Sequence, residues 1–388
     1  MDILDKELKE HKHIVFCEDH YNPLNIIRSL GEKGIRSIVI LKSDSPVLIN
    51  HCRYPQKIHY VKTYDEGYKI LLYEYGCEEN KPFVYCSDDL TMCYLDSHYN
   101  ELVSRFYIYN AGQQGRIEWL QNKDNITTLG AEVGLDSIKK EVVETGVLPT
   151  TLSYPIITKV LASTMGAWKK DVYICKDEIE LKKAYKNIKS PKLILQEYVD
   201  KVGEFCMEGF SINDGQDIFV PYIADYIRYY NDSYGHYMNM IPFEDGVLKE
   251  KIKELFKRTK YNGIFEIEFM KGPDGKRYFL EINFRASTWN YALTVGGGNL
   301  PYFWSKSTLA NRILWEELNL KSNAFRAIVE PADFSANVRK VGIFTWIRQC
   351  LSAECHYYYN RKDPMPFYSY IRDRISEKIC SLRFKSKD

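Results

Sequence analysis

Three side chains that can bind ions occupy alternate positions of one short segment, FLEINFR, at residues 279–285. Residues two apart on a β-strand face the same side, so Glu281, Asn283 and Arg285 would share one face of a strand. Carboxylate and amide oxygens suit a hard metal ion, and a planar guanidinium suits an anion. The alternative is the polar face of an ordinary amphipathic strand.

A predicted hairpin brings a further acid to this face. The alternating segment GIFEIEFM is followed by a turn at Pro273-Asp274-Gly275 and by the strand that carries Glu281. Pairing across that turn places Glu268 beside Glu281. Carboxylates that converge repel each other unless a cation lies between them, and Mg²⁺ or Mn²⁺ accepts such ligands together with phosphate oxygens. We therefore predict a metal site made of Glu268, Glu281 and Asn283, with plain cross-strand polar pairs as the alternative.

The elements upstream supply a lysine. The run YPIIT predicts a strand that ends at Lys159, where a solvated lysine is unexpected. Residues 123–135 predict a helix closed by a glycine, and LASTMGAWKKDVYIC, after Lys159, predicts a mobile hairpin. A helix over residues 178–188 should pack through Ile179, Leu181, Ala184 and Ile188. Residues 192–212 predict two strands with a turn at Gly203, and the segment before Glu268 predicts a helix and a break at Gly263.

The N-terminal segment predicts a parallel sheet. Strands at Ile14–Phe16 and Arg36–Leu41 flank a helix at Pro23–Leu30, which is a β-α-β unit. Its first turn, CEDHYNPL, lacks the glycines that a dinucleotide fingerprint needs, so NAD or FAD binding is not expected there. A later strand over residues 81–90 ends in Ser87-Asp88-Asp89, whose acids either face a cleft or cap a helix.

Composition narrows the class of protein. A chain of 388 residues predicts two or three domains. Its 53 basic and 52 acidic residues give a net charge of +1, so no global field recruits nucleic acid or a membrane. No apolar run reaches the roughly 20 residues of a membrane span, and the start lacks the apolar core of a signal peptide. We expect a soluble, cytoplasmic protein, whose ten scattered cysteines are free thiols.

From about residue 115 to 305 the chain resembles the ATP-grasp ligases. Their metal motif is an acid on one strand and a Glu-x-Asn element on the next. In the D-alanine ligase branch the two acids are thirteen residues apart, as Glu268 and Glu281 are here. The extension to Arg285 is similar to the biotin carboxylase and carbamoyl phosphate synthetase branches, where that arginine lies in the reaction centre. The proline that usually precedes it is Phe284 here. The resemblance implies metal ligation by Glu268, Glu281 and Asn283 and a catalytic role for Arg285.

The resemblance also implies nucleotide-binding positions. Lys159 and Lys123 match the two phosphate-binding lysines of the family, and Lys159 also counts as catalytic. The segment LILQEYV resembles the hinge that receives adenine. Glu197 would then lie near the exocyclic amine, and backbone groups of Tyr198 and Val199 would pair with the ring edge.

Other positions follow in the same order. Glu204, seven residues after Glu197, matches the acid that binds the ribose hydroxyls. The loop Ser163–Lys170 corresponds to the lid over the phosphates but has fewer glycines than usual, so contacts from Lys169 or Lys170 stay open. Arg228 and His236 either select the substrate or lie on the surface. The segment VGGGNLP at residues 295–301 is either a turn or a substrate contact.

The implied fold class is α/β. A Rossmann-like, pre-ATP-grasp parallel-sheet domain over residues 1–114 precedes a two-lobed α+β ATP-grasp domain over residues 115–330. Its first lobe, residues 115–190, carries the phosphate lid, and its second, residues 191–330, carries the metal site. A C-terminal helical extension covers residues 331–388, and its basic amphipathic end either packs as a plain helix or touches a partner or a membrane surface.

The implied activity is carbon–nitrogen ligation with ATP and Mg²⁺. A carboxylate would form an acyl phosphate, ADP would leave, and an amine would displace phosphate to give an amide. The whole chain looks most like the D-aspartate ligase and carboxylate–amine ligase branch. The partners would be a small carboxylate and a small amine. One possibility is an amino acid joined to a peptide carboxylate, as in cell-wall synthesis, and the other is the amidation of a sugar acid in surface-polysaccharide synthesis. The oligomeric state stays open, a homodimer included. The alternative is a non-catalytic ATP-binding sensor, against which the intact acids and Lys159 argue.

Overall fold

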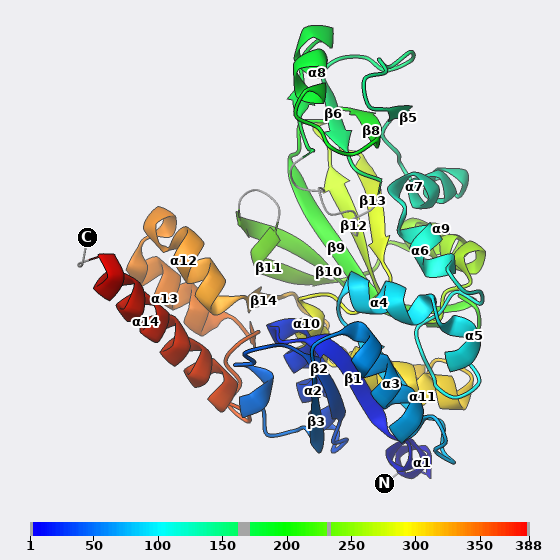
Figure 1. Ribbon diagram of the computed structural model, residues 1–388, viewed down its shortest axis with the longest axis vertical. Helices are drawn as coiled ribbons and strands as arrows, with labels where there is room; N and C mark the ends of the chain where they lie inside the picture. The colour runs from blue at the N-terminus through cyan, green and yellow to red at the C-terminus, as the bar shows by residue number, and fades with distance from the viewer. Residues whose placement is uncertain (1–2, 162–170, 231–233, 386–388) are drawn as a thin grey trace.

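The computed structural model describes residues 3–161, 171–230 and 234–385. The chain begins with a four-stranded parallel sheet in the order β3-β2-β1-β4 (Figure 1). The apolar residues Ile14–Cys17 of β1 are completely buried, as expected for a parallel sheet covered on both faces. The predicted β-α-β unit is therefore confirmed. Its elements are α1 (Ile3–Glu10), β1 (His13–Glu18), α2 (Tyr21–Glu32), β2 (Ile38–Lys42), η1 (Ile49–His51), β3 (Lys57–Val61), α3 (Tyr64–Tyr75) and β4 (Phe83–Cys86).

Short helices then lead to a small antiparallel sheet in the order β5-β8-β6-β7. It has a core of its own, in which Ile156, Leu181 and Leu195 are completely buried. Ile179, which was expected on the packed side of α8, is 64% exposed, so that part of the prediction is wrong. The predicted mobile hairpin lies largely outside the described residues. The elements are α4 (Asp89–Asp96), α5 (Tyr99–Leu102), α6 (Arg116–Gln121), α7 (Lys123–Glu132), β5 (Lys140–Glu144), β6 (Ile156–Lys159), β7 (Ile174–Cys175), α8 (Glu178–Tyr185) and β8 (Lys192–Glu197).

A seven-stranded sheet, β13-β12-β9-β10-β11-β14-β15, forms the centre of the molecule (Figure 1). The predicted hairpin is its edge, because β12 and β13 pair antiparallel across the turn before Arg277. Helix α11 packs between this sheet and the N-terminal sheet, and the ring of its Trp304 contacts Phe83, Tyr85 and Tyr109. The elements are β9 (Gly203–Ile212), β10 (Asp217–Tyr230), β11 (Tyr234–Pro242), α9 (Gly246–Thr259), β12 (Gly263–Lys271), β13 (Arg277–Asn283), α10 (Asn290–Val295), α11 (Leu300–Ala310), η2 (Trp315–Glu317) and β14 (Phe325–Ile328).

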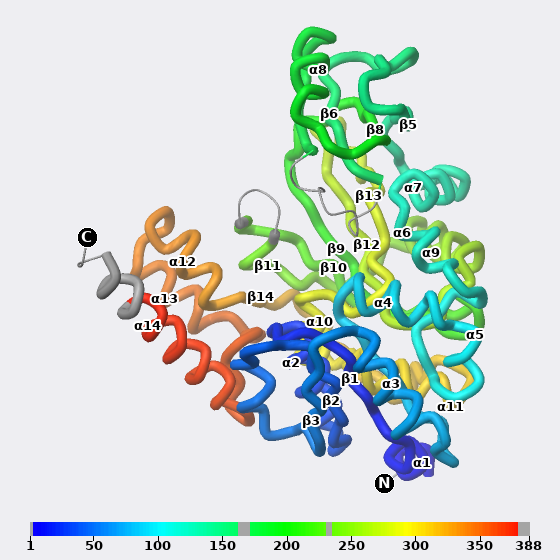
Figure 2. Tube along the Cα trace, in the orientation of Figure 1, coloured from blue at the N-terminus to red at the C-terminus, as the bar shows by residue number. Residues whose placement is uncertain are grey.

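The C-terminal part stands beside the central sheet as three helices, in orange to red in Figures 1 and 2. It is more than the predicted helical extension, because β15 joins the seven-stranded sheet next to β14. A buried ion pair also ties it to the N-terminal sheet, with Arg28 Nε 2.9 Å from Asp363 Oδ2. Its elements are α12 (Glu330–Val341), α13 (Ile343–Ser352), β15 (Cys355–His356) and α14 (Met365–Lys385).

The domain limits themselves stay predictions. The pairing shows only that β8, which begins at Lys192, belongs to the small sheet and so extends past the predicted lobe limit at residue 190. Nine cysteines in the described parts of the chain are free thiols, as expected. Among the described residues no helix combines the length and the hydrophobicity needed to cross a membrane.

Candidate active site

The edge hairpin places the predicted acids together. Glu268 lies opposite Glu281, and Glu266 lies opposite Asn283. One step farther along, the register shifts so that Phe269 faces Phe279 and Leu280 has no partner on β12. This β-bulge turns Leu280 toward the site, where it lines two adjoining cavities, instead of the hydrophobic side where the alternation placed it.

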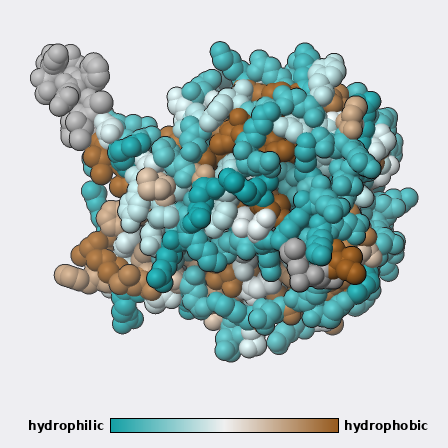
Figure 3. Space-filling model, turned by 90° about the horizontal axis from the view of Figure 1, so that it is seen from below, coloured by the Kyte–Doolittle hydropathy of each residue, from teal (hydrophilic) through white to brown (hydrophobic). Residues whose placement is uncertain are grey.

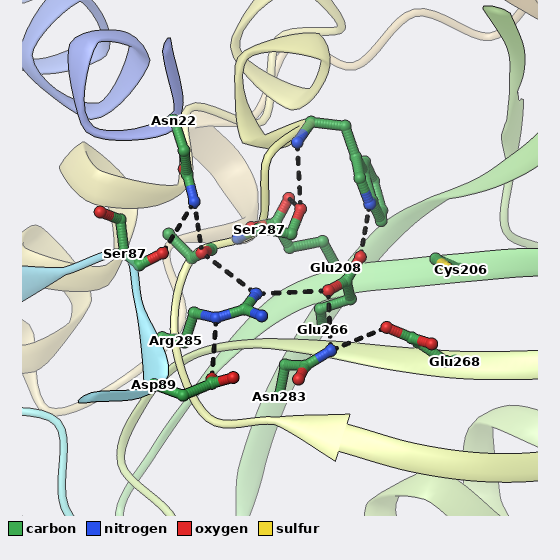
Figure 4. A network of polar contacts seen from close by, with 12 residues as sticks. Asn22, Ser87, Asp89, Cys206, Glu208, Glu266, Glu268, Asn283, Arg285 and Ser287 are labelled. Atoms are coloured by element: carbon green, nitrogen blue, oxygen red, sulfur yellow. Dashed lines mark hydrogen bonds and ion pairs between the residues drawn. The ribbon is translucent and has the colours of Figure 1, made fainter. Parts of the chain in front are cut away.

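Glu266 is the centre of the polar network in Figure 4. Its Oε2 accepts a hydrogen bond from Asn283 Nδ2 at 3.0 Å, and its Oε1 accepts one from the indole of Trp289 at 2.6 Å. The same Asn283 amide donates to Glu268 Oε1 at 2.9 Å. Asn283 therefore bridges two carboxylates and holds both on the sheet face.

The charge on this face is unbalanced. Burial raises the pKa of Glu268 well above its usual range, and the neighbouring Glu281 and Glu266 raise it further. Burial alone would also raise the pKa of Glu281, but the Lys123 ammonium outweighs it, so the pKa of Glu281 is lowered. Lys123 Nζ lies 2.5 Å from Glu281 Oε2. The structure thus places Lys123 against one of the predicted metal-binding acids, and its predicted role in binding phosphate stays a prediction.

Lys159 ends β6 and lies on the other side of the same space. With Lys123 and Glu281 it lines a cavity of about 70 Å³ between the small sheet and β13. Burial lowers the pKa of Lys159 to about 8, and the Lys123 ammonium lowers it as well. Two buried ammonium groups side by side suit a polyanion, because each favours a negative charge between them.

Arg285 lies just after the end of β13, at the border with the N-terminal sheet. Its Nε donates to Asp89 Oδ1 at 3.1 Å, and its Nη1 donates to Glu266 Oε2 at 3.4 Å. Burial alone would lower its pKa, but Asp89 and the glutamates raise it above its ordinary value. Arg285 also lines a second cavity, of about 120 Å³, with Glu204 and Glu268. The guanidinium is therefore both a brace between two acids and part of the cavity wall.

The predicted hinge follows β8 directly. Glu197 Oε1 accepts a hydrogen bond from the amide of Ser153 at 3.2 Å. The Tyr198 amide donates to the carbonyl of Pro155 at 2.8 Å. This amide is thus engaged within the protein, and the predicted pairing of the Tyr198 and Val199 backbone with an adenine ring stays a prediction. The carbonyl of Tyr198 and the backbone of Val199 remain the predicted contacts.

Glu204 is the second residue of β9 and lies on the same sheet face as Glu266 and Glu268. Lys201 Nζ lies 3.1 Å from Glu204 Oε1, and the backbone amide of Glu204 donates to Tyr229 Oη at 2.9 Å. Burial raises the pKa of Glu204, while Lys201 lowers it in part. Its place on the wall of the second cavity is compatible with the predicted ribose contact, which stays a prediction.

The N-terminal sheet contributes residues that the sequence did not single out as site residues. Asp88 caps α4, which is the capping alternative for this acidic pair, and the next residue, Asp89, accepts a hydrogen bond from Arg285. Asn22 donates to the carbonyls of Ser87 and Ala286 at 3.0 Å each, which joins the end of β4 to the segment after β13 (Figure 4). These contacts fix the N-terminal sheet against the acids.

Some candidates lie elsewhere. Arg228 is held by Asp333 at 3.0 and 2.5 Å and by Gln349 at 2.5 Å, so it braces α12 and α13 and does not reach the site. His236 is buried on β11, where it lines a separate groove. The glycines of residues 295–301 make a packed turn: a Cβ on Gly297, whose φ is +94°, would lie 2.0 Å from the carbonyl oxygen of Asn319. Lys169 and Lys170 lie outside the described residues.

Sequence reasoning missed two acids that belong to the network. Glu266 precedes Glu268 by two positions, so the alternation already placed both on one strand face. Glu208 lies opposite Glu266 on β9 and accepts hydrogen bonds from the amide and hydroxyl of Ser287 at 2.7 and 3.0 Å. The pattern Glu204-x-Cys206-x-Glu208 carried the signal, but an amphipathic strand gives the same pattern.

The residues present fit a divalent cation, although not as a closed metal centre. In the described parts of the chain no three acidic, histidine or cysteine side chains are arranged to hold a metal ion by themselves. Two carboxylates and an amide, as in the predicted set, leave the remaining positions to water and phosphate, which is the usual situation for Mg²⁺. In the structure the Lys123 ammonium balances one charge of this set, with its Nζ 2.5 Å from Glu281 Oε2.

Neither family models nor the sequences of curated proteins match the chain. The fold, however, is shared with solved structures. The N5-carboxyaminoimidazole synthetase from Staphylococcus aureus, complexed with ADP, superimposes with a TM-score of 0.63 at 14% identity over 85% of each chain. The L-amino acid ligase from Bacillus licheniformis has a TM-score of 0.61 at 14% identity, over 83% of this chain and 80% of that one.

A third neighbour was solved with its nucleotide and metal. It is the biotin carboxylase domain of the 2-oxoglutarate carboxylase from Hydrogenobacter thermophilus, in complex with MgADP, ADP and bicarbonate. Its TM-score is 0.61 at 17% identity, over 82% of this chain and 75% of that one. These neighbours are ATP-grasp ligases, and the chain has the α/β ATP-grasp fold that the sequence predicted.

Proposed function

We propose that the protein is an ATP-dependent carbon–nitrogen ligase that joins a carboxylate to an amine through an acyl phosphate. The supporting observation is one sheet edge on which Glu268, Glu281 and Asn283 lie beside Lys123, across a small cavity from Lys159. Phosphoryl transfer depends mainly on positioning and on neutralising charge, and this edge offers both. Neighbours with the same fold were solved with ADP and with MgADP, which supports a nucleotide at the corresponding place.

In this proposal the buried lysines bind the phosphates, the hinge after β8 receives the adenine, and Glu204 binds the ribose. Glu268, Glu281 and Asn283 would hold Mg²⁺, which when bound neutralises the charge of the phosphate oxygens. The two cavities of about 70 and 120 Å³ are much smaller than the roughly 300–1,000 Å³ of typical ligand sites. Nucleotide binding therefore requires the small sheet to move away from β13.

Arg285 orients the acid substrate. Two of its donors are engaged by Asp89 and Glu266, which fixes the plane of the guanidinium at the cavity wall. An oxygen of the substrate carboxylate attacks the γ-phosphorus, and the bond to ADP breaks. The neutral amine nitrogen then attacks the acyl carbon, phosphate leaves with the electron pair of the broken carbon–oxygen bond, and the nitrogen releases one proton to solvent or to the departing phosphate. A fixed cation beside the acyl group stabilises the negative charge that develops on its oxygen.

Within the ATP-grasp ligases we place the protein in the D-aspartate ligase and carboxylate–amine ligase branch. The support is the combination of the N-terminal parallel sheet with the Glu-x-Asn-x-Arg segment and its continuation through residue 301. Amino acids and uronic acids, the precursors of peptide and polysaccharide amides, are therefore the substrates to test.

The test is hydroxylamine trapping with a panel of these acids, ATP and Mg²⁺. We expect ADP, phosphate and a hydroxamate with at least one acid. Glu281→Gln keeps the size of the side chain but removes its charge, so it should abolish turnover and leave the circular dichroism spectrum unchanged. Glu178→Gln, which changes an exposed acid on α8, serves as the matched control and should keep full activity.

Three outcomes would contradict the proposal. Release of AMP would indicate an adenylate in place of an acyl phosphate. Full turnover by folded Glu281→Gln would remove Glu281 from the metal site. ATP binding without turnover across the whole panel would favour the non-catalytic sensor.

A further inference from the structure

Helix α13 presents hydrophobic side chains on the side that faces away from the protein. Phe344 and Leu351 are 86% and 80% exposed, and Ile343 and Ile347 are 44% and 42% exposed. At the pitch of an α-helix these four positions span an arc of about 100°. They form a continuous strip, which we call the α13 apolar face. Large exposed hydrophobic strips are uncommon on soluble proteins and indicate an interaction site.

The opposite side of α13 is firmly attached to the fold. Trp346 Nε1 donates to Asp333 Oδ2 at 2.9 Å, and Gln349 Oε1 accepts from Arg228 at 2.5 Å. Cys350 packs against the small core that contains Tyr237. The helix therefore has a fixed rotation about its own axis, and this rotation turns the α13 apolar face outward.

The segment of the chain that carries the α13 apolar face is basic. Between residues 334 and 353 the sequence contains Arg339, Lys340 and Arg348 and no acid, whereas the whole chain is almost neutral. All three basic residues are exposed. None of them forms an ion pair with another residue in the described ranges. A partner with negative charge at its surface would complement them.

A groove continues the hydrophobic surface toward α14. It measures about 900 Å³, and its apolar wall includes Phe334, Trp346 and Phe367. The ring of Phe334 packs on that of Trp346 with their centroids 4.9 Å apart, so the groove adjoins α13. Figure 3 shows a hydrophobic projection at the lower left of the molecule, on the side where Figure 1 draws α12–α14.

We propose that the α13 apolar face binds the surface of an anionic lipid bilayer. A helix with Phe, Ile and Leu on one side and Arg and Lys at its edges suits the boundary between headgroups and acyl chains. Anionic headgroups supply the negative charge that Arg339, Lys340 and Arg348 complement. A lipid surface is deformable, so it can cover a convex helix and fill the adjoining groove without a matching shape.

The experiment is co-sedimentation of the full-length protein with phosphatidylcholine vesicles, with and without about 30% phosphatidylglycerol, a composition chosen to give the surface charge of anionic membranes. We expect binding to the anionic vesicles that weakens as salt is added. Phe344→Ala combined with Leu351→Ala should weaken binding by about tenfold or more, because two inserted side chains are lost. Arg348→Glu should weaken it by at least about fivefold.

A matched control changes exposed apolar residues on other faces. Tyr73 and Val247 are 81% and 71% exposed, so Tyr73→Ala combined with Val247→Ala should bind like the unchanged protein. Absence of vesicle binding, or equal losses in both double variants, would overturn the proposal. Sedimentation velocity tests whether a second copy of the chain covers this face instead. If the protein bound no vesicles but formed a dimer, and the double variant Phe344→Ala and Leu351→Ala dissociated that dimer, this face would be an interface between two copies.

Discussion

Lys159 is a buried lysine in a position to bind phosphate, and its lowered pKa allows this role to be tested by changing the pH. Burial and the nearby Lys123 lower its pKa to about 8. Below that pH the ammonium is present, and above it the charge is lost. A bound phosphate favours the charged form, so we predict that ATP affinity falls by about tenfold as the pH rises from about 7 to about 9.5, the loss of one charge-assisted contact.

Isothermal titration across this pH range measures the effect. Lys159→Arg is the matched variant, because a guanidinium stays charged throughout the range. Its affinity should change with pH much less than that of the unchanged protein. Equal pH profiles for the two proteins would remove Lys159 from the phosphate site.

A substitution at Arg285 distinguishes a catalytic role of this residue from a bracing role. Arg285→Lys keeps the charge but loses the planar fork, so we predict that the rate of amide formation falls by about 10²-fold, comparable to the loss of one oxyanion donor. Nucleotide affinity should change little, because Lys123 and Lys159 bind the phosphates in the proposal. A normal rate together with a lower melting temperature would show that Arg285 only holds Asp89 and Glu266 together.

The sequence predicted those site residues that lie on one hairpin. The turn at Pro273-Asp274-Gly275 brings Glu268 close to Glu281, as local chemistry predicts, and the bulge at Leu280 then places the two directly opposite each other. Asp89 and Glu208 could not be assigned in this way. They reach the network from strands that are distant in the sequence, and only the packing of the two sheets brings them to Arg285 and Glu266.

Asn22 links the N-terminal sheet to the segment that follows the edge hairpin. Its side chain is buried, donates to the carbonyls of Ser87 and Ala286, and accepts from Asn290 Nδ2 at 2.7 Å. Asn22→Ala leaves these groups without their partner, so we predict a loss of about 1–3 kcal/mol in the free energy of unfolding. Urea denaturation followed by circular dichroism measures it.

Asn50→Ala is the matched control, since Asn50 is exposed and its two side-chain hydrogen bonds, to the Pro46 carbonyl at 3.1 Å and from Tyr60 Oη at 2.7 Å, lie at the surface. Its effect should stay within about 0.5 kcal/mol. If both variants were equally stable, Asn22 would not hold the two parts together.

Strand and helix positions were largely predictable because apolar periodicity defines them. The departures have local causes. The bulge at Leu280 depends on the pairing with β12, which no single strand encodes. Arg285 was expected on the strand, but the chain turns away after Asn283 to meet the N-terminal sheet. Ile179 is apolar and yet exposed, because the core of the small sheet is filled by Leu181 and Ala184.

For the whole molecule, the Arg28–Asp363 ion pair joins segments from opposite ends of the chain. Both side chains are almost completely buried, and Arg28 also donates to the carbonyls of Tyr357, Tyr358 and Asp363. Asp363→Asn leaves a buried guanidinium without its countercharge, so we predict a destabilisation of about 3–5 kcal/mol. The shift of the urea midpoint tests it.

The matched control is Glu316→Gln, which breaks an exposed ion pair with Arg312. Its midpoint should not change, because solvent and salt screen such pairs. If the urea midpoints of both variants shifted equally, the buried charge pair would contribute no more to stability than the exposed pair. The sequence offered no sign of this connection, since 335 positions separate its two partners.

The same ion pair sets an order of events during synthesis on the ribosome. The strands of the N-terminal sheet are complete once residue 86 has been made. Apart from a bond to Asn25 Oδ1 at 3.3 Å, however, the polar groups of Arg28 find their partners in residues 357–363. Domains usually fold from the N-terminus as the chain grows. Here α2 must wait, with a guanidinium that lacks its countercharge, until residues 357–363 have been translated. The N-terminal sheet is therefore among the last parts of the fold to be completed.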